Sequence, residues 1–457
     1  MMITKHIRLG FFLLAASLLS CQQEKEANAE KQKPNIIFVM VDDMGYGDLG
    51  CFGQQVLKTP NIDKIAAEGV VFTQCYSGST VCAPSRSTLM TGQHTGHTKV
   101  RGNFSQILLD LPNPNRVPLA EEDTTLAEVM KQGAYVTAMT GKWGLGEPAT
   151  TGEPNQQGFD QWLGFLNQRR AHDHFPDYIW HNRDTFKLKG NDPVFNQSNV
   201  TFSHNLFTNF ALDFIDNNRD TSFFLYLPYC IPHDYYHIPE EDLTEFKDKD
   251  WTHDEKVYAA MIAKIDQDMG RLLAKLQEHQ LDSSTMVFFC SDNGAARRWE
   301  GRFNSSGSLR GRKRDMYEGG IRTAMIVRMP GTIPAGTKSE YPWYFPDVLP
   351  TLAELIEVKA PDNIDGISVL PEILGEGMPE SNRFLYWEFH EGGFYQAVRW
   401  KNWKAVREGL DGKLELYDLS GDVSEENDVS RENPEIVKKI EDYLEGARSK
   451  SKYWKAK

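Results

Sequence analysis

Short apolar runs recur along the chain with helical patterns between them, and this alternation constrains the fold more than any other feature. The runs lie at residues 36–41, 135–139, 223–227, 286–290 and 324–328. A run that is apolar at every position is typical of a strand covered on both faces. The helical patterns lie at residues 61–68, 123–132, 204–216, 253–278 and 346–356. Strands that alternate with helices predict an α/β fold with a large, mostly parallel central sheet flanked by helices.

The pattern changes near residue 381, where strand-like segments follow one another without long helices between them. These segments lie at residues 384–389, 394–399, 403–407 and 413–417, and a helical pattern follows at 434–447. Turn sequences such as Gly-Gly and Asp-Gly separate them, as in antiparallel hairpins. We therefore predict a large domain over residues 34–380 and a small C-terminal subdomain, an antiparallel sheet with one helix, over residues 381–457.

The N-terminus has the pattern of an export signal. Two basic residues precede an uncharged run at residues 9–19, which is too short to span a bilayer as a helix. Its last two residues and the next two read Leu18-Leu19-Ser20-Cys21, which resembles the site where bacterial lipoproteins are cleaved and lipidated. These features predict a signal peptide over residues 1–20, a lipid on Cys21 and a flexible tether over residues 21–33. The protein would then be an exported, periplasmic or cell-surface lipoprotein of a bacterial outer membrane, attached only by its lipid.

The net charge of −14 argues against some classes of binding partner. Binding to nucleic acid without sequence preference depends on Lys and Arg that neutralise phosphates, so an acidic chain argues against a nucleic-acid partner. An acidic enzyme can still act on an anionic substrate if its cations converge on one pocket.

The six cysteines do not form the dense pattern of a disulfide scaffold. Cys21 belongs to the predicted lipid anchor, and Cys82 belongs to a motif described below. The other four are either buried thiols or partners in one or two disulfides: Cys51, Cys75, Cys230 and Cys290.

Polar residues follow two of the predicted strands. Asp42 and Asp43 come directly after the first run, and Asp292 and Asn293 come soon after the fourth. In open α/β sheets the ligand crevice lies beyond the carboxyl ends of the strands. Three carboxylates and one amide are hard oxygen donors, which suit Ca²⁺ or Mg²⁺. Each pair alone is typical of a turn or a helix cap, but their common position at strand ends favours a metal site.

The most specific motif begins at Cys82. The sequence reads Cys82-Ala-Pro84-Ser-Arg86, with Thr-Gly further on. This stretch resembles the modification signature Cys-x-Pro-x-Arg of the formylglycine-dependent (type I) sulfatases, which belong to the alkaline-phosphatase-like superfamily. The resemblance extends from residue 34 to the C-terminal helix. Pro84 suits a first helical turn, and a helix N-terminus attracts anions such as sulfate.

The resemblance implies a sulfuric ester hydrolase with a modified cysteine, a metal and several sulfate-binding cations. A formylglycine-generating maturase would oxidise the cysteine to formylglycine. The metal, Ca²⁺ or else Mg²⁺, would be held by Asp42, Asp43, Cys82, Asp292 and Asn293. The catalytic residues would be Cys82, Arg86, Lys142, His233 and Lys313.

The reaction that the resemblance implies is nucleophilic catalysis with metal assistance. One hydroxyl of the hydrated formylglycine would attack sulfur, while Arg86, Lys142 and Lys313 stabilise charge on the sulfuryl oxygens. His233, as imidazolium, would protonate the leaving oxygen. The second hydroxyl would then expel sulfate, a route that a plain serine or cysteine ester lacks.

One position departs from the family pattern. Sulfatases often read Lys-x-His around Lys142, but the third position here is Gly144. An imidazole that would orient groups or relay protons near the formylglycine is therefore missing. His94, His97 and His172 are candidates to replace it, although each is also typical of a structural histidine.

A polar loop at residues 168–174, followed by aromatic residues, is typical of a sugar-binding site. The candidate substrate-binding residues are His97, Arg169, Arg170, His172 and His174. For an exported sulfatase we expect a fragment of a sulfated glycan, with a sulfated galactose or N-acetylgalactosamine as the first candidate. Sulfation at O4 follows only from analogy with relatives that carry glycine at the position of Gly144.

Two other functions remain open. A phosphoester hydrolase on the same scaffold would generally hold two zinc ions with further Asp and His ligands, which the sequence does not place. A glycan-binding lipoprotein without activity would fit the change at Gly144, but it would not explain the intact motif at Cys82.

Overall fold

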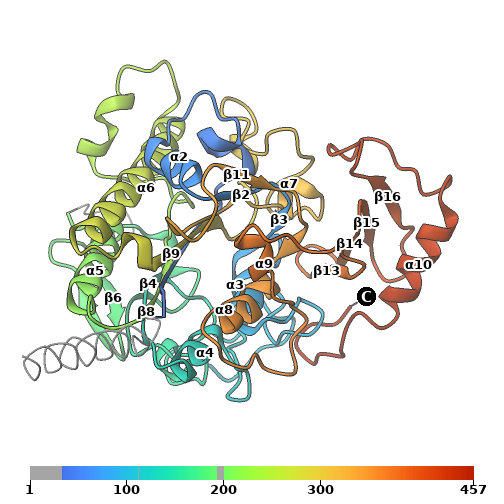
Figure 1. Ribbon diagram of the computed structural model, residues 1–457, viewed down its shortest axis with the longest axis horizontal. Coiled ribbons are helices and arrows are strands. Elements are labelled where there is room, and N and C mark those ends of the chain that lie inside the picture. The colour runs from blue at the N-terminus through green and yellow to red at the C-terminus, as the bar shows by residue number, and fades with distance from the viewer. Residues whose placement is uncertain (1–32, 112, 193–199, 457) are drawn as a thin grey trace, which may run out of the picture. The chain divides into compact units, whose positions relative to one another are not determined.

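A ten-stranded sheet runs through the part of the chain that the structure describes (Figure 1). The structure is a computed structural model that describes residues 33–111, 113–192 and 200–456, so the predicted signal peptide, Cys21 and the tether up to residue 32 lie outside it. In sheet order the strands are β11 (Thr337–Ser339), β2 (Val70–Phe72), β10 (Met325–Arg328), β9 (Thr285–Ser291), β1 (Asn35–Val41), β8 (Phe223–Pro228), β4 (Val136–Lys142), β5 (Gln161–Phe165), β6 (Tyr178–His181) and β7 (Asp184–Lys187).

The strands in the middle of the sheet are parallel. β9, β1, β8, β4 and β5 run in the same direction, with Val39 of β1 beside Leu227 of β8 and Phe289 of β9. β10 pairs antiparallel with β9 and β2, and β6 and β7 are antiparallel at the opposite edge. The predicted α/β fold with a mostly parallel sheet is therefore confirmed. The carboxyl ends of five adjacent strands meet at one edge of this sheet.

Alternate residues of the buried strands face two separate layers of helices. In β1, Ile37 and Val39 belong to one core cluster, whereas Phe38 and Met40 belong to the other. The first cluster includes side chains of α2 (Pro60–Ala67), α5 (Ser203–Asn217) and α6 (His253–Glu278). The second includes side chains of α3 (Cys82–Thr91), α4 (Leu126–Gln132) and α8 (Val348–Leu355). None of the helices in the described ranges combines the length with the apolar composition that a transmembrane helix requires.

Capping residues set helix boundaries that the sequence pattern placed differently. α4 begins at Leu126, rather than at the predicted residue 123, because Thr125 and Glu128 form a reciprocal cap. The same cap joins Thr252 to Glu255 at the start of α6.

The remaining short helices are α7 (Glu318–Ile321), α9 (Leu370–Ile373), η1 (Tyr46–Asp48), η2 (Gly50–Phe52), η3 (Pro154–Gln156), η4 (Arg170–His172), η5 (Glu240–Phe246), η6 (Asp282–Ser284), η7 (Arg297–Trp299) and η8 (Phe345–Asp347).

The C-terminal segment forms an antiparallel sheet with one helix, as predicted. Its elements are β13 (Phe384–Phe389), β14 (Tyr395–Trp400), β15 (Trp403–Glu408), β16 (Glu415–Asp418) and α10 (Pro434–Leu444). The indole N–H of Trp387 donates to the Ser77 carbonyl oxygen at 2.8 Å, next to the pair of β3 (Cys75–Tyr76) and β12 (Trp343–Tyr344). Buried Lys404 contacts the carboxylates of Glu318 and Glu425. Residues Asn35–Lys457 accordingly form one compact unit.

Glu388 in β13 is the centre of a buried ion-pair cluster. Its carboxylate lies 3.1 Å from Arg101, 2.7 Å from Arg448 and 2.9 Å from His390. Burial alone would raise the pKa of Glu388, but these three partners lower the pKa to about 2. Because this folded-state pKa lies below that of the unfolded chain, the cluster stabilises the fold at neutral pH. The stabilisation is lost as the pH falls below about 4.3 toward the folded-state pKa.

We expect Glu388→Gln to lower the free energy of unfolding by about 3–5 kcal/mol near neutral pH, because it leaves Arg101 and Arg448 without their carboxylate. Urea denaturation of both proteins near neutral pH and at about pH 3 would measure the difference, which should shrink at the lower pH. Glu380→Gln, which removes an exposed partner of Lys401, is the control and should change little. An equal difference at both pH values would contradict this interpretation.

The cysteines of the described residues are free thiols. Cys51, Cys75, Cys82, Cys230 and Cys290 form no disulfide in this part of the chain. Burial raises the pKa of the Cys230 thiol to about 12, which keeps it protonated and inert. The sequence left buried thiols and disulfides open for the four cysteines outside the lipid anchor and the Cys82 motif. In the structure all four are thiols.

Candidate active site

Two pairs of polar residues meet at the carboxyl edge of the sheet. Asp42 and Asp43 follow β1, and Asp292 and Asn293 follow the neighbouring β9. The backbone N–H of Asp43 donates to Asp292 Oδ1 at 3.2 Å, and Asn293 Nδ2 donates to Asp43 Oδ1 at 2.7 Å. All four side chains are buried. The structure therefore brings together the four oxygen-donor residues that the sequence predicted as metal ligands.

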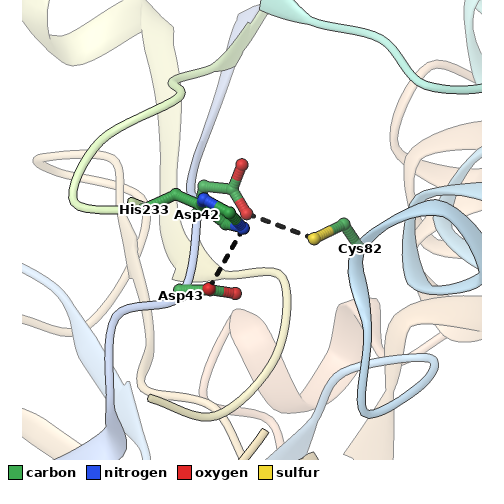
Figure 2. Close-up of side chains that lie close together, drawn as sticks. All are labelled: Asp42, Asp43, Cys82 and His233. Atoms are coloured by element: carbon green, nitrogen blue, oxygen red, sulfur yellow. Dashed lines mark hydrogen bonds and ion pairs between the residues drawn. The ribbon is translucent and has the colours of Figure 1, made fainter. Parts of the chain in front are cut away.

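Helix α3 places the side chain of Cys82 at its N-terminus. The preceding Val81 is extended, and Pro84 lies in the first turn, where its missing N–H leaves no intrahelical hydrogen bond unmade. The thiol of Cys82 lies 3.4 Å from Asp42 Oδ1 (Figure 2). The positive end of the helix dipole at this point favours an anionic group.

Arg86 and Lys142 compensate two of the buried carboxylates. Arg86, one turn further along α3, donates from Nε and Nη2 to Asp292 Oδ2 at 3.1 and 2.7 Å. Lys142, the last residue of β4, lies 2.5 Å from Asp42 Oδ2. Arg86 Nη1 also donates to the carbonyl oxygen of Lys142 at 2.6 Å, so the two cations hold each other in place.

Lys313 and His233 complete the cluster on the side of Asp43. Lys313 Nζ lies 2.6 Å from Asp43 Oδ2 and 3.7 Å from the Cys82 sulfur. His233 Nε2 lies 3.3 Å from the same Asp43 oxygen (Figure 2) and 3.1 Å from Lys313 Nζ. The other ring nitrogen, Nδ1, lies 2.6 Å from Asp234 Oδ1. The predicted catalytic residues and metal ligands thus form one cluster around Cys82.

The charges in this cluster shift the pKa values of its members. Burial alone would raise the pKa of Asp42, but Lys142 and His233 outweigh it, so this pKa lies well below its usual range. Burial and the negative charge of Asp42 raise the pKa of Asp292 to about 6. Burial would lower the pKa of His233, but Asp43 outweighs it and the pKa rises to about 10. The negative charge of Asp43 thus favours the imidazolium form of His233, which is the form that can protonate a leaving oxygen.

The donor set fits a divalent metal. Asn293 Oδ1 is buried and has no hydrogen-bond partner among the residues that the structure describes, so this acceptor is left for a ligand. Ligand atoms of Asp42, Asp43, Cys82 and His233 lie within 4.8 Å of one another. Carboxylate and amide oxygens are the donors that Ca²⁺ and Mg²⁺ prefer. The cluster can therefore hold a divalent cation beside residue 82.

Two of the predicted substrate-binding residues contact His233. The ring of His172 lies against the ring of His233, with centroids 4.2 Å apart, and buried His174 contacts the His233 carbonyl oxygen at 3.0 Å. Burial lowers the pKa of His172 to about 3 and that of His174 to about 4, so both are neutral. Of the three histidines considered as replacements for the missing imidazole, His172 is the one that the structure places at the cluster.

The other predicted substrate-binding residues have different surroundings. His97 Nδ1 lies 2.9 Å from Asp365 Oδ1. The ring of His97 stacks on that of His94, with ring centroids 4.4 Å apart. Arg170 forms an ion pair within its own loop, and Arg169 is exposed. In the described part of the chain, neither His94 nor His97 contacts the cluster around Cys82, so neither is placed to replace the missing imidazole.

Several polar residues beside the start of α3 were not found from the sequence. Asn103 Oδ1 accepts a hydrogen bond from the backbone N–H of Ala83 at 3.0 Å, and Arg116 Nη1 donates to the Asn103 carbonyl oxygen at 2.7 Å. A small cavity is lined by residues that include Ala83, Asn103, Arg116, Gly144 and Glu147. No local pattern marks these residues as a group, because they come from loops far apart in the sequence.

Two family models match this chain. The model described as Sulfatase matches residues 34–358, and the model described as N-sulphoglucosamine sulphohydrolase, C-terminal, matches residues 311–450. The chain belongs to the sulfatase family. It is therefore a sulfuric ester hydrolase, as the motif at Cys82 implied.

Individual relatives agree with this class. The sulfatase is 32% identical to the N-acetylgalactosamine-6-sulfatase of Canis lupus familiaris, over 83% of this chain and 75% of the relative. It is 26% identical to the N-acetylgalactosamine-6-O-sulfatase of Bacteroides thetaiotaomicron, over 95% of this chain and 97% of the relative. The crystal structure of Ps i-CgsB in complex with k-i-k-neocarrahexaose matches with a TM-score of 0.79 and 26% identity, over 93% of this chain and 95% of that chain.

Proposed function

We propose that this sulfatase releases sulfate from a sulfated sugar by means of a formylglycine formed at residue 82. The observation that carries the proposal is the position of Cys82, which lies at the N-terminus of α3, 3.4 Å from Asp42 and 3.7 Å from Lys313. A formylglycine hydrate at this point would supply the nucleophile and, through its second hydroxyl, the route by which sulfate leaves. A formylglycine-generating maturase is the partner that this chemistry requires.

The side chains around the nucleophile have separate tasks. Arg86 and Lys142 are fixed on buried carboxylates, so their charges are in place before a substrate binds. Such preorganised cations stabilise the charge that develops on the sulfuryl oxygens. His233, held at Nδ1 by Asp234, donates the proton on Nε2 to the leaving sugar oxygen. Lys313 lies beside His233 and adds a further positive charge.

Ca²⁺ is the metal that we propose for this site, with Mg²⁺ as the alternative. Asp42, Asp43, Asp292 and Asn293 would hold the metal together with residue 82. When bound, the cation would stabilise negative charge on the nucleophile and polarise the sulfate group. A carboxylate-rich set favours Ca²⁺, because Mg²⁺ demands near-octahedral geometry and gives up its water reluctantly.

The unpartnered oxygen of Asn293 gives a direct test of metal binding. We expect Ca²⁺ to raise the melting temperature of the wild-type protein, because it binds the folded and not the unfolded chain. Asn293→Ala should largely remove this increase. Asn205→Ala is the matched control, because Asn205 Oδ1 is also buried without a partner among the described residues but lies in α5. Melting curves with Ca²⁺ and with a chelator measure the effect, and an undiminished increase in Asn293→Ala would contradict the assignment.

For the substrate we propose a sulfated N-acetylgalactosamine or galactose unit of a glycan fragment. Support comes from relatives named as N-acetylgalactosamine-6-sulfatases, which favour the 6-sulfate over the 4-sulfate expected by analogy from Gly144. The test is sulfate release from N-acetylgalactosamine 6-sulfate, N-acetylgalactosamine 4-sulfate and glucosamine 6-sulfate. Fastest release from the first supports the proposal, whereas release from glucosamine 6-sulfate alone would overturn it.

We also propose that the protein is exported and lipidated on Cys21, with a catalytic domain over residues 34–380 and a C-terminal subdomain over residues 381–457. The apolar run before Cys21 and the change of strand pattern near residue 381 support these assignments. Incorporation of a labelled fatty acid in a bacterial host tests the anchor. The label should enter the wild-type protein and not Cys21→Ala, and equal labelling would reject the assignment.

The two other functions predict different results when sulfate and phosphate esters are compared as substrates. A phosphoester hydrolase would cleave the phosphate ester of an alcohol faster than its sulfate ester, and a passive binder would bind the sulfated sugar without releasing sulfate. Paired sulfate and phosphate esters of one aryl alcohol, assayed with maturase-treated protein, separate these alternatives. We expect the sulfate ester to be the faster substrate.

A further inference from the structure

Gln168 lies at the same edge of the sheet as the catalytic cluster. It comes shortly after β5, which pairs in parallel with β4, the strand that ends at Lys142. The two loops stay paired beyond the strands, because the backbone N–H of Gly144 donates to the carbonyl oxygen of Leu166 at 2.9 Å. Gln168 is thereby brought next to the residues that follow Lys142.

The side chain of Gln168 fills the space that a side chain at position 144 would need. A β-carbon on Gly144 would lie only 2.1 Å from Gln168 Nε2. Gly144 also has a φ of +84°, a conformation that favours glycine. In the Lys-x-His pattern of other sulfatases an imidazole occupies this position of the sequence. Here glycine and the carboxamide of Gln168 together take its place.

The carboxamide of Gln168 is buried and unpartnered. The residue is 4% exposed, and within the described ranges neither Nε2 nor Oε1 has a hydrogen-bond partner. Leaving a buried polar group unsatisfied costs about 1–3 kcal/mol. Because proteins pair nearly all of their buried polar groups, an unpaired amide at the sheet edge that holds the catalytic cluster leaves both a donor and an acceptor available to a ligand.

A second buried polar group lies close by. Gly144 lines a small cavity together with Ala83, the residue after Cys82. Glu147 lines the same cavity, is 1% exposed, and has an Oε1 atom without a partner in the described part of the chain. An unsatisfied polar atom therefore belongs to a residue that shares this cavity with Gly144, the neighbour of Gln168, and with Ala83.

We propose that Gln168 is a substrate-binding residue that replaces the missing histidine. Its Nε2–H donates to an oxygen of the substrate's sulfate group, and its Oε1 accepts a hydrogen bond from a neighbouring sugar hydroxyl. The inference rests on the proposed sulfatase function. An amide offers a donor and an acceptor together and does not titrate, unlike an imidazole. It can therefore hold the ester over a wide pH range, and the proton for the leaving oxygen comes from His233.

Gln168→Leu tests this inference, because leucine keeps an amide-like volume and makes no hydrogen bonds. With a monosulfated sugar that the wild-type enzyme hydrolyses, we expect kcat/KM to fall about 10- to 100-fold, as for the loss of a hydrogen bond to a charged group. The melting temperature should stay level or rise, because the variant removes an unsatisfied buried amide.

The matched control is Gln157→Leu. Gln157 is also buried and its Oε1 also has no partner among the described residues, but its Nε2 donates to the carbonyl oxygens of Ala120 and Thr151 at 3.1 and 2.7 Å. This variant should lower the melting temperature and leave kcat/KM of the folded enzyme unchanged. The two glutamines therefore separate a ligand-binding amide from a structural one.

Gln168→Glu gives a second test with a side chain of the same shape. A carboxylate would repel the sulfate group, so kcat/KM should fall further than in Gln168→Leu. Wild-type kcat/KM in both variants would overturn the inference. Sulfate release by the wild-type protein is measured before the variants are compared. If the wild-type protein released no sulfate, the proposed function would be overturned instead.

Discussion

Cys82→Ala should release no measurable sulfate while it keeps the wild-type fold. Formylglycine cannot form from alanine, so both the nucleophile and the route for sulfate release are lost. We expect kcat/KM to fall by about a thousandfold or more, as when other covalent nucleophiles are removed. The melting temperature should change little, because the substitution removes a single small group from the start of a helix. Sulfate release and thermal melting of the same preparation measure the two effects.

Cys51→Ala is the matched control for this experiment. Cys51 is also a free thiol, but it lies beside Asp63 and not in the catalytic cluster. Its substitution should leave sulfate release at the wild-type rate. Turnover retained in Cys82→Ala would contradict the role assigned to residue 82.

Arg86→Ala should damage stability and activity together. The guanidinium of Arg86 is fully buried and donates twice to Asp292. Its removal leaves a buried carboxylate without its partner, which should lower the free energy of unfolding by about 3–5 kcal/mol. The loss of one preorganised cation at the sulfuryl oxygens should lower kcat by about 100- to 1,000-fold. Urea denaturation and steady-state kinetics on the folded fraction measure the two effects separately.

Two further variants distinguish these effects. Arg86→Lys keeps the charge but not the paired contacts of the guanidinium, so both losses should be smaller than in Arg86→Ala. Arg328→Ala removes another buried arginine, which pairs with Glu68 and Asp282 instead of the cluster. It should lower stability and leave kcat unchanged. Wild-type stability and kcat in Arg86→Ala would contradict the assigned role.

The central strands could be predicted because they are covered on both faces. All seven residues of β1 and all seven of β9 are buried, which makes the apolar runs continuous. β7 could not be predicted, because each of its four residues is exposed and no apolar pattern marks it. β2 and β11 have three residues each, too few to show a period. Burial accounts for β1, β9 and β7, and strand length accounts for β2 and β11.

Some residues of the candidate active site could be predicted from the sequence, and others could not. Cys82 and Arg86 stand one turn apart on a single helix, and Asp42 and Asp292 end neighbouring strands, so motif and strand position predict them. The relation between Gly144 and Gln168 depends on how the loops after β4 and β5 pack. No single stretch of sequence contains that packing, so the sequence alone points to other histidines as replacements for the missing imidazole.

The mass of the peptide that contains residue 82 tests the central claim most directly. The protein is produced together with a formylglycine-generating maturase, digested, and measured by mass spectrometry, and sulfate release is assayed on the same preparation. We predict an aldehyde at residue 82 and a rate of sulfate release that rises in proportion to the fraction of aldehyde. An unmodified thiol at residue 82 in a preparation that releases sulfate at the full rate would contradict the account.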